Sequence, residues 1–348
     1  MRLVALSDAY IPPGPMGAGL AGLASRGVEV EVRHWAHPSV VELQRDNLAI
    51  EQGGPDAVSL SPGILEGLEG FDIAVSQFAP LGAAFLAAAP RLRVIGVLRT
   101  GTENVDVAGA TRRGVSVLNT PARNARAVAE CAIGLMLAEM RNLARAHAAL
   151  KRGEWRRQFA NSEAIPELGG KTVGLVGYGA VARIVARLLA PWGCRLLAHD
   201  PFFGGDPAPA ELVDLPRLLA ESDVVSLHAR YARETHHLIG AAELARMKPG
   251  AILVNTARSG LVDEEALVRA LRERRITGAA LDVFDREPLP PGHPLLELDT
   301  VTLAPHLAGS TIDAFHGSPK LMAGHLERML AGEGPLPVVN GIQPVLRS

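Results

Sequence analysis

A glycine-rich turn between a strand-like run and an amphipathic helix constrains this chain most strongly. The apolar run VGLV at residues 173–176 leads into Gly177 and Gly179, and apolar residues then recur at helical spacing. In such a turn the first glycine permits a tight bend, and the second lets the backbone approach a pyrophosphate. Ala182 stands where a third small residue lets the helix pack closely on the strand. The segment therefore predicts a dinucleotide-binding βαβ unit.

The residues that follow this turn predict which dinucleotide binds. Ala180 and Val181 open the helix, so their backbone N–H groups would face the phosphates. The next strand-like run ends at Asp200, whose carboxylate can accept hydrogen bonds from the adenosine ribose. No Arg or Lys directly follows Asp200, so the 2′-phosphate of NADP would meet an unscreened negative charge. We predict NAD(H) as the cofactor; the alternative is a glycine turn and a capping aspartate without a nucleotide.

Short β-branched runs alternate with helical stretches along two parts of the chain. The first series has strand-like runs at residues 3–6, 28–32, 73–75, 94–97 and 115–118. The second series has them at residues 171–176, 195–199, 224–227, 252–254, 279–283 and 301–304. This alternation predicts two α/β domains with parallel sheets, and 348 residues suffice for two domains. A single long helix is expected over residues 125–152 and another over residues 311–330.

Charge and cysteine content exclude several classes of function. Lys and Arg number 35 against 37 Asp and Glu, so no global positive field attracts nucleic acid. No apolar run approaches the ~20 residues of a membrane span, and the N-terminus is read as a first strand, not a signal peptide. Cys131 and Cys194 lie in apolar stretches without metal-ligand spacing, and the histidines form no ligand set. We expect a cytoplasmic protein that binds no metal, membrane or nucleic acid.

Three polar residues follow strand-like runs in the second series and suggest an active site. Arg258, Glu287 and His306 each stand in a loop that leaves a predicted strand at the carboxyl edge of the sheet. A 2-hydroxy acid dehydrogenase needs a cation for the substrate carboxylate, an acid–base group for the C2 oxygen, and a partner that keeps this group protonated. Singly, each residue could be a surface charge, a turn residue or a structural histidine. Their joint order favours the catalytic interpretation.

The chain resembles the D-isomer-specific 2-hydroxyacid dehydrogenase family, which includes phosphoglycerate, glyoxylate and hydroxypyruvate-type enzymes, over nearly its whole length. Four ordered motifs carry the resemblance: GTENVD at residues 101–106, the glycine turn with Asp200, RSGLVDE at residues 258–264, and the pair Glu287-Pro288 and Pro305-His306. The resemblance implies that Arg258 binds the substrate carboxylate and carbonyl, that His306 is the general acid–base, and that Glu287 hydrogen-bonds its imidazole. Loss of Glu287 should therefore shift the pH profile.

The resemblance also implies a domain organisation. A Rossmann NAD-binding domain, residues 121–308, would be inserted into a flavodoxin-like substrate-binding domain, residues 1–120 plus 309–348, with a cleft between them. Family members dimerise through the long helix, here residues 125–152, so a homodimer is expected.

Further contacts follow from the resemblance. Backbone amides of Thr100, Gly101 and Thr102 would bind the substrate carboxylate, and Asp282 would lie near the nicotinamide carboxamide. The other residues expected to contact the cofactor are Thr256, Ala257, His306 and Gly309.

Two arginines depart from the family pattern. Arg99 and Arg123 stand in loops where many relatives have glycine. We hypothesise that one of them recognises a second anionic group of the substrate; the alternative is a solvated surface arginine. A third departure is Arg230, which stands where relatives often have proline. The geometry of this cofactor-side loop is therefore not predicted.

Other functions on this fold stay as alternatives. A non-enzymatic NAD(H)-sensing co-regulator would need neither Arg258, Glu287 nor His306, and a formate-type dehydrogenase has a different residue in place of Glu287. A phosphoglycerate dehydrogenase is an alternative within the family, although the chain is shorter than members with a regulatory domain. The side-chain pocket, and so the particular acid, is not predicted.

Overall fold

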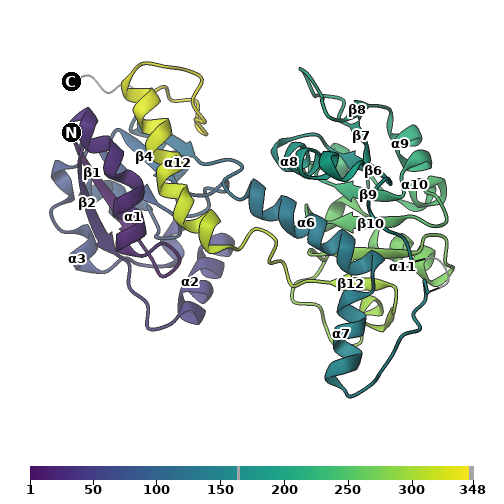
Figure 1. Cartoon of the computed structure of the whole chain (residues 1–348). Coiled ribbons are helices and arrows are strands. Elements are labelled where there is room, and N and C mark those ends of the chain that lie inside the picture. Colours follow the sequence, from purple (N-terminus) through teal and green to yellow (C-terminus); the bar gives the residue numbers. More distant parts are fainter. Residues whose placement is uncertain (163–164, 345–348) are drawn as a thin grey trace. The chain divides into compact units, whose positions relative to one another are not determined.

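The computed structural model describes residues 1–162 and 165–344 and divides into two compact units. One comprises Met1–Arg123 with Thr311–Ser348, and the other comprises Asn124–Ser310. Both are parallel sheets flanked by helices, so the predicted α/β class is confirmed (Figure 1). The last four residues of the predicted 309–348 segment lie outside the described residues.

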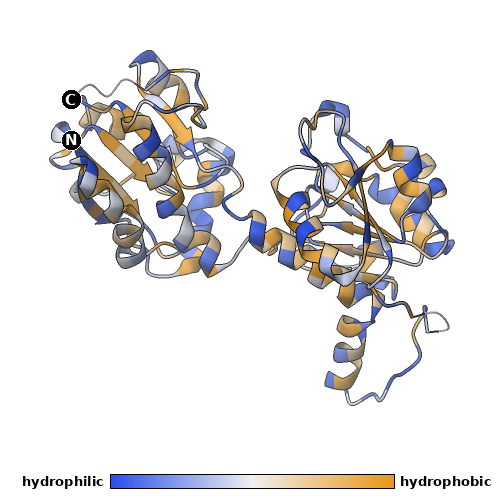
Figure 2. Ribbon diagram, turned by 45° about the horizontal axis from the view of Figure 1, so that its top comes forward, coloured by the Kyte–Doolittle hydropathy of each residue, from blue (hydrophilic) through white to orange (hydrophobic). Residues whose placement is uncertain are grey.

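The first unit has a five-stranded parallel sheet with the flavodoxin-like order β2-β1-β3-β4-β5. Its strands are β1 (Arg2–Ser7), β2 (Glu29–His34), β3 (Ile73–Ser76), β4 (Val94–Val97) and β5 (Ser116–Asn119). Its helices are α1 (Pro13–Leu20), α2 (Val40–Gly53), α3 (Pro62–Leu65), α4 (Ala83–Ala88), α5 (Val107–Arg112) and α12 (Ile312–Leu330). The inner strands are apolar and buried because helices cover both faces of the sheet (Figure 2).

Helix α12 brings the C-terminal part of the chain back onto the first unit. Thr311 caps it by accepting a hydrogen bond from the backbone N–H of Ala314. Gly19 on α1 lets the two helices approach closely, since a Cβ there would lie 2.6 Å from the Cβ of Pro319. The helix predicted over residues 311–330 is thereby confirmed.

The second unit has a seven-stranded parallel sheet with the order β12-β11-β10-β9-β6-β7-β8. Its strands are β6 (Thr172–Val176), β7 (Arg195–His199), β8 (Glu211–Leu212), β9 (Val224–Leu227), β10 (Ile252–Asn255), β11 (Gly278–Leu281) and β12 (Val301–Leu303). Its helices are α6 (Ala125–Met140), α7 (Leu143–Lys151), α8 (Ala180–Leu189), α9 (Leu215–Glu221), α10 (Ala241–Arg246) and α11 (Glu264–Arg272). All six predicted strands are present, and the short edge strand β8 was not predicted.

The prediction of one continuous helix over residues 125–152 is wrong. The chain forms α6 and α7 instead, separated at Asn142, which is buried and has a left-handed φ of 57°. Asparagine tolerates this conformation and commonly ends helices. Its side-chain amide donates a 2.6 Å hydrogen bond to Oδ1 of Asn161, which fixes the break.

A buried glutamate joins α6 to the last strand of the same unit. Glu139 accepts a 2.7 Å hydrogen bond from the Thr302 hydroxyl on β12 and pairs with Arg145 on α7. Burial raises the pKa of Glu139 to about 7, against the opposing effects of Arg145 and Thr302. These contacts fix β12, from which the loop carrying His306 leaves the sheet.

Candidate active site

The glycine turn of the second unit leaves the start of α8 open. Gly177 has a φ of +85°, and a Cβ there would lie 2.5 Å from the backbone of Ala229, so only glycine fits. At Gly179, by contrast, a Cβ would meet no atom within 4 Å, and this glycine is exposed together with Ala180. The first backbone N–H groups of a helix have no partner within it. This opening therefore fits a pyrophosphate at the positive end of α8.

Asp200 follows β7 and is tied to the same turn. Its Oδ2 accepts a 2.9 Å hydrogen bond from the backbone N–H of Tyr178, and its Oδ1 accepts one of 3.0 Å from Phe202. Each carboxylate oxygen keeps further acceptor capacity for ribose hydroxyls. Tyr178 was not singled out from the sequence; its ring is buried and its hydroxyl donates to the carbonyl of Pro207. The tyrosine thus braces the turn from inside.

Thr256 and Ala257 leave the carboxyl end of β10. The Thr256 hydroxyl is buried and has no hydrogen-bond partner among the described residues. The backbone N–H of Ala257 is already used, because it donates to Oδ1 of Asn255. An orphaned buried hydroxyl at a sheet edge fits a polar ligand atom, so these residues fit a dinucleotide.

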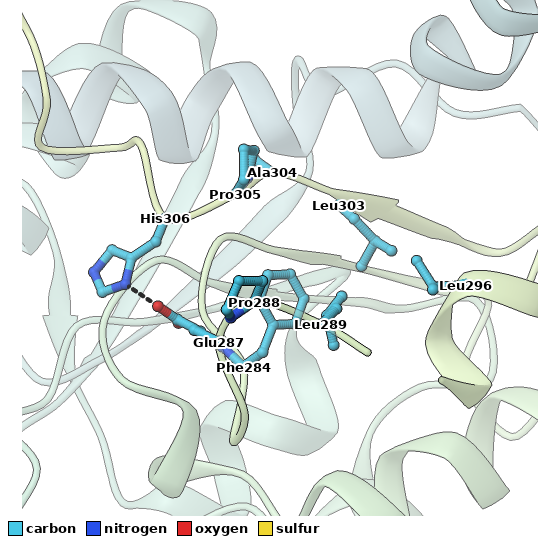
Figure 3. Close-up of a pocket in the computed structure, with 9 residues that line it drawn as sticks. All are labelled: Phe284, Glu287, Pro288, Leu289, Leu296, Leu303, Ala304, Pro305 and His306. Atoms are coloured by element: carbon cyan, nitrogen blue, oxygen red, sulfur yellow. Dashed lines mark hydrogen bonds and ion pairs between the residues drawn. The ribbon is translucent and has the colours of Figure 1, made fainter. Parts of the chain in front are cut away.

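His306 and Glu287 meet beside an apolar pocket. The imidazole Nδ1 lies 2.7 Å from Oε2 of Glu287, whose Oε1 accepts a hydrogen bond from the backbone N–H of Phe284 (Figure 3). His306 has a left-handed φ of 51° and lies in the loop that follows β12. The pocket has a volume of about 470 Å³, and apart from this pair it is lined by Phe284, Pro288, Leu289, Leu296, Leu303, Ala304 and Pro305. The two residues form an acid–base pair with an apolar wall on one side.

Asp282 holds the loop that carries His306. Its carboxylate is buried, and its two oxygens accept hydrogen bonds of 2.8 and 2.9 Å from the backbone N–H groups of Leu307 and Ala308. The sequence suggested a place near the nicotinamide for Asp282 but gave no sign of this backbone contact. Gly309 follows in the same loop, where a Cβ would collide with the side-chain amide of Asn124. The loop is therefore held in place directly after His306, at residues 307–309.

The Arg258 side chain is exposed, and no described carboxylate balances its positive charge. Its guanidinium donates a 2.7 Å hydrogen bond to the carbonyl of Ala257, and no carboxylate within residues 1–162 and 165–344 forms an ion pair with it. An unpaired arginine after a strand can form a bidentate pair with a carboxylate ligand.

The predicted loop of the first unit offers free backbone donors. The carbonyls of Thr100 and Thr102 accept hydrogen bonds from Asn119 and from the backbone of Val105. The backbone N–H groups of Thr100, Gly101 and Thr102 donate to no protein acceptor in the described part of the chain. The arrangement is compatible with an anion held by main-chain amides.

Arg99 and Arg123 differ in environment. Arg99 is buried and pairs with Glu51 at 3.2 Å and with Glu103, so it is no solvated surface arginine. Arg123 is partly buried, lies 5.0 Å from the ring centre of Phe315, and has no ion-pair partner among the residues described.

Two negative observations concern the described residues alone. No group of three or more His, Cys, Asp or Glu side chains is arranged there to hold a metal ion. Within the same residues, no helix has both the length and the apolarity that crossing a membrane requires.

Comparison with known proteins gives a consistent result. Residues 133–308 match the family model described as D-isomer specific 2-hydroxyacid dehydrogenase, NAD binding domain. A glyoxylate reductase of Thermofilum pendens is 42% identical over 266 residues, covering 75% of this chain and 78% of the relative. A D-3-phosphoglycerate dehydrogenase of Methanocaldococcus jannaschii is 41% identical over 257 residues, covering 72% of this chain but 48% of the relative. The solved structure of a D-2-hydroxyisocaproate dehydrogenase superposes with a TM-score of 0.75 at 25% identity, covering 98% of this chain and 100% of the other.

Proposed function

This chain belongs to the D-isomer-specific 2-hydroxyacid dehydrogenase family, as an NAD-dependent oxidoreductase, and we propose that it interconverts a small 2-oxo acid and its D-2-hydroxy acid. The observation that carries the proposal is the 2.7 Å contact between His306 and Glu287 on loops that leave the NAD-binding sheet. The nicotinamide, when bound, exchanges a hydride with the C2 carbon. The chain must supply the proton and hold the acid.

His306 is the proposed proton donor and acceptor. Glu287 engages Nδ1, so Nε2 is left to face the C2 oxygen of the acid. In the reducing direction the proton leaves Nε2 for this oxygen, and in the oxidising direction the imidazole takes it back. Glu287 holds the imidazole by its Nδ1 and so fixes the direction in which Nε2 points. The amide of Phe284 fixes the orientation of Glu287.

Arg258 is the proposed anchor of the substrate. Its planar guanidinium can hold a carboxylate by two parallel hydrogen bonds, and the lack of an ion pair to any described residue supports this role. The backbone amides of Thr100, Gly101 and Thr102 are proposed as further carboxylate donors, since none is used by the described protein.

The cofactor contacts are proposed as follows. Gly177 and Gly179, with the amides of Ala180 and Val181, hold the pyrophosphate, and Asp200 accepts from the ribose hydroxyls. The negative charge of Asp200 disfavours NADP, because no cation directly follows it. The further contacts proposed come from Thr256, Ala257, Asp282, His306 and Gly309.

The domain roles are also part of the proposal. Residues 121–308 form the NAD-binding domain, and residues 1–120 with 309–348 form the substrate-binding domain. We propose a homodimer through the segment 125–152, where α7 exposes Leu143 and Leu150. A cytoplasmic location fits the free thiols of Cys131 and Cys194.

The test is a turnover assay that follows loss of NADH with purified protein. Glyoxylate, pyruvate, hydroxypyruvate, 2-oxoglutarate and 3-phosphohydroxypyruvate serve as substrates, with chiral analysis of each product. We expect at least one acid to be reduced to the D-hydroxy acid, and Arg258→Gln to raise its KM more than Arg258→Lys does. If NADH binds but none of these acids is reduced, the proposal fails and the NAD(H)-sensing alternative is favoured.

A further inference from the structure

The carboxyl edge of the five-stranded sheet holds polar groups that the proposed chemistry does not use. Asp8 directly follows β1, and Gln77 directly follows β3. These strands are neighbours in the order β2-β1-β3-β4-β5, with Leu6 paired to Ser76. The strand order reverses between β1 and β3, and open parallel sheets bind ligands at the carboxyl ends of the strands at such a point.

Three buried atoms at this edge have no hydrogen-bond partner within residues 1–162 and 165–344. They are Oδ2 of Asp8 and both amide atoms of Gln77, which is fully buried. The other Asp8 oxygen accepts from the backbone N–H groups of Tyr10 and Ile11. Buried polar groups are nearly always hydrogen-bonded, so orphaned donors and acceptors at a switch point indicate a polar ligand.

Aromatic rings connect this edge to both arginines. Tyr10 packs against Phe78 and Phe315 at centroid distances of 5.7 and 4.7 Å. Arg99 lies 5.4 Å from the Phe78 ring, and Arg123 lies 5.0 Å from the Phe315 ring. The polar residues at this edge, the aromatic residues beside them and Arg123 are together called the Arg123 cluster: Asp8, Tyr10, Gln77, Phe78, Arg123 and Phe315.

The charges separate the two arginines. Arg99 is neutralised by Glu51 and Glu103, and its Nε donates to the carbonyl of Gly101. Its role is therefore to hold the Thr100–Thr102 loop. Arg123 forms no ion pair within the described residues; its Nη1 reaches the carbonyl of Ala314 at 3.4 Å.

The protonation equilibria of the cluster are consistent with an anion. Burial lowers the pKa of Arg123 to about 10, and the nearby charge of Arg99 acts in the same direction against the effect of Asp8. Burial raises the pKa of Asp8, against the backbone amides of Ile11 and Tyr10. A second anion would stabilise the Arg123 charge that burial disfavours.

We propose that the Arg123 cluster binds a second anionic group of the substrate, a carboxylate or phosphate remote from C2, with Arg123 as its cation and the Gln77 amide as a further donor. This inference rests on the proposed function. It narrows the substrate class to 2-oxo acids that carry two negative groups.

The experiment compares acids that share a carbon chain but differ in whether they carry a remote anionic group. In one arm kcat/KM is measured for 2-oxoglutarate against 2-oxovalerate, and in the other for 3-phosphohydroxypyruvate against hydroxypyruvate. The wild type should prefer the dianion in one arm, which identifies the group as a carboxylate or a phosphate. Arg123→Gln should reduce that preference by about ten- to a hundredfold, as expected for the loss of a charge-assisted hydrogen bond, and Arg123→Lys should retain part of it.

Arg26→Gln removes the same charge from an exposed site and serves as the matched control. Competitive inhibition of the wild type by glutarate against valerate tests the same site without a variant, in case Arg123→Gln folds poorly. Equal use of both acids in both arms, or an equal loss for both in Arg123→Gln, overturns the inference alone. Absence of turnover with every acid overturns the proposed function and this inference with it.

Discussion

The Oδ1 of Asp282 accepts a 2.8 Å hydrogen bond from the backbone N–H of Leu307, the residue next to His306. Its Oδ2 accepts a second hydrogen bond from Ala308. A buried carboxylate at the end of β11 thus sets the conformation of the loop that presents the imidazole. Asp282 is a positioning residue for His306 in addition to its proposed place near the nicotinamide.

Asp282→Asn should lower kcat about tenfold or more, because an amide retains one acceptor oxygen and the loop loses one of its two contacts. The free energy of unfolding should fall by about 1–3 kcal/mol for the lost charge-assisted hydrogen bond. Steady-state kinetics and urea unfolding measure both. Asp214→Ala, which removes the side-chain N-cap of α9, is the control: it should cost stability without a matching loss of kcat. An equal effect of the two variants on kcat would contradict the positioning role.

Glu287→Gln should lower kcat for reduction by about a hundredfold, within the range usual for acid–base groups. The amide replaces the carboxylate that holds the imidazole through Nδ1, so the orientation of Nε2 should be less well fixed and proton transfer should slow. Steady-state kinetics measure kcat and KM of this variant and of Glu264→Gln, the control that alters a carboxylate beside His293 instead. An unchanged kcat in Glu287→Gln would remove the carboxylate from the proposed chemistry.

Asp200→Asn should raise kcat/KM for NADPH and lower it for NADH, each about tenfold. The variant removes the negative charge that repels a 2′-phosphate but keeps an acceptor for the Tyr178 amide, so the turn should stay folded. Asp206→Asn, in the loop beyond it, provides the comparison. If kcat/KM for NADPH does not rise in Asp200→Asn, residues other than Asp200 determine the preference for NADH.

Glu139 predicts a pH dependence of stability. Its pKa rises from 4.5 to about 7 on folding, so between these values the native state holds a proton that the unfolded chain has released. The free energy of unfolding should therefore decline as pH rises through this window, by about 3 kcal/mol in total. Glu139→Gln should flatten the slope, whereas Glu130→Gln, an exposed residue of the same helix, should retain it. A slope unaltered by Glu139→Gln would contradict the account.

The strands and the glycine turn could be predicted because their determinants are local. Buried parallel strands are short apolar runs, and Gly177 has a φ of +85°, a backbone conformation that favours glycine. The break at Asn142 could not be predicted, because the residue fits a helix by pattern and leaves it through a contact with Asn161. β8 is too short to produce a recognisable pattern.

Part of the candidate site also depended on distant contacts. The sequence predicted that Arg258, Glu287 and His306 follow successive strands at the carboxyl edge of the sheet. The backbone N–H of Leu307 donates a hydrogen bond to Asp282. Every residue except proline has such an N–H group, so the sequence does not reveal which one Asp282 binds. Arg99 differs from Arg123 in having an ion pair with Glu51, which lies on the distant helix α2. The sequence could therefore not decide which of the two arginines is available to a ligand.

The most direct test of the central claim is single-turnover reduction by His306→Asn in complex with NADH. The asparagine cannot transfer a proton, so the rate of the chemical step should fall by at least about a hundredfold, while NADH binding measured by fluorescence stays within about twofold. His316→Asn, on α12, is the control and should react like the wild type. A His306→Asn protein that binds NADH and reduces the acid at the wild-type rate would contradict the assignment of His306 as the acid–base group.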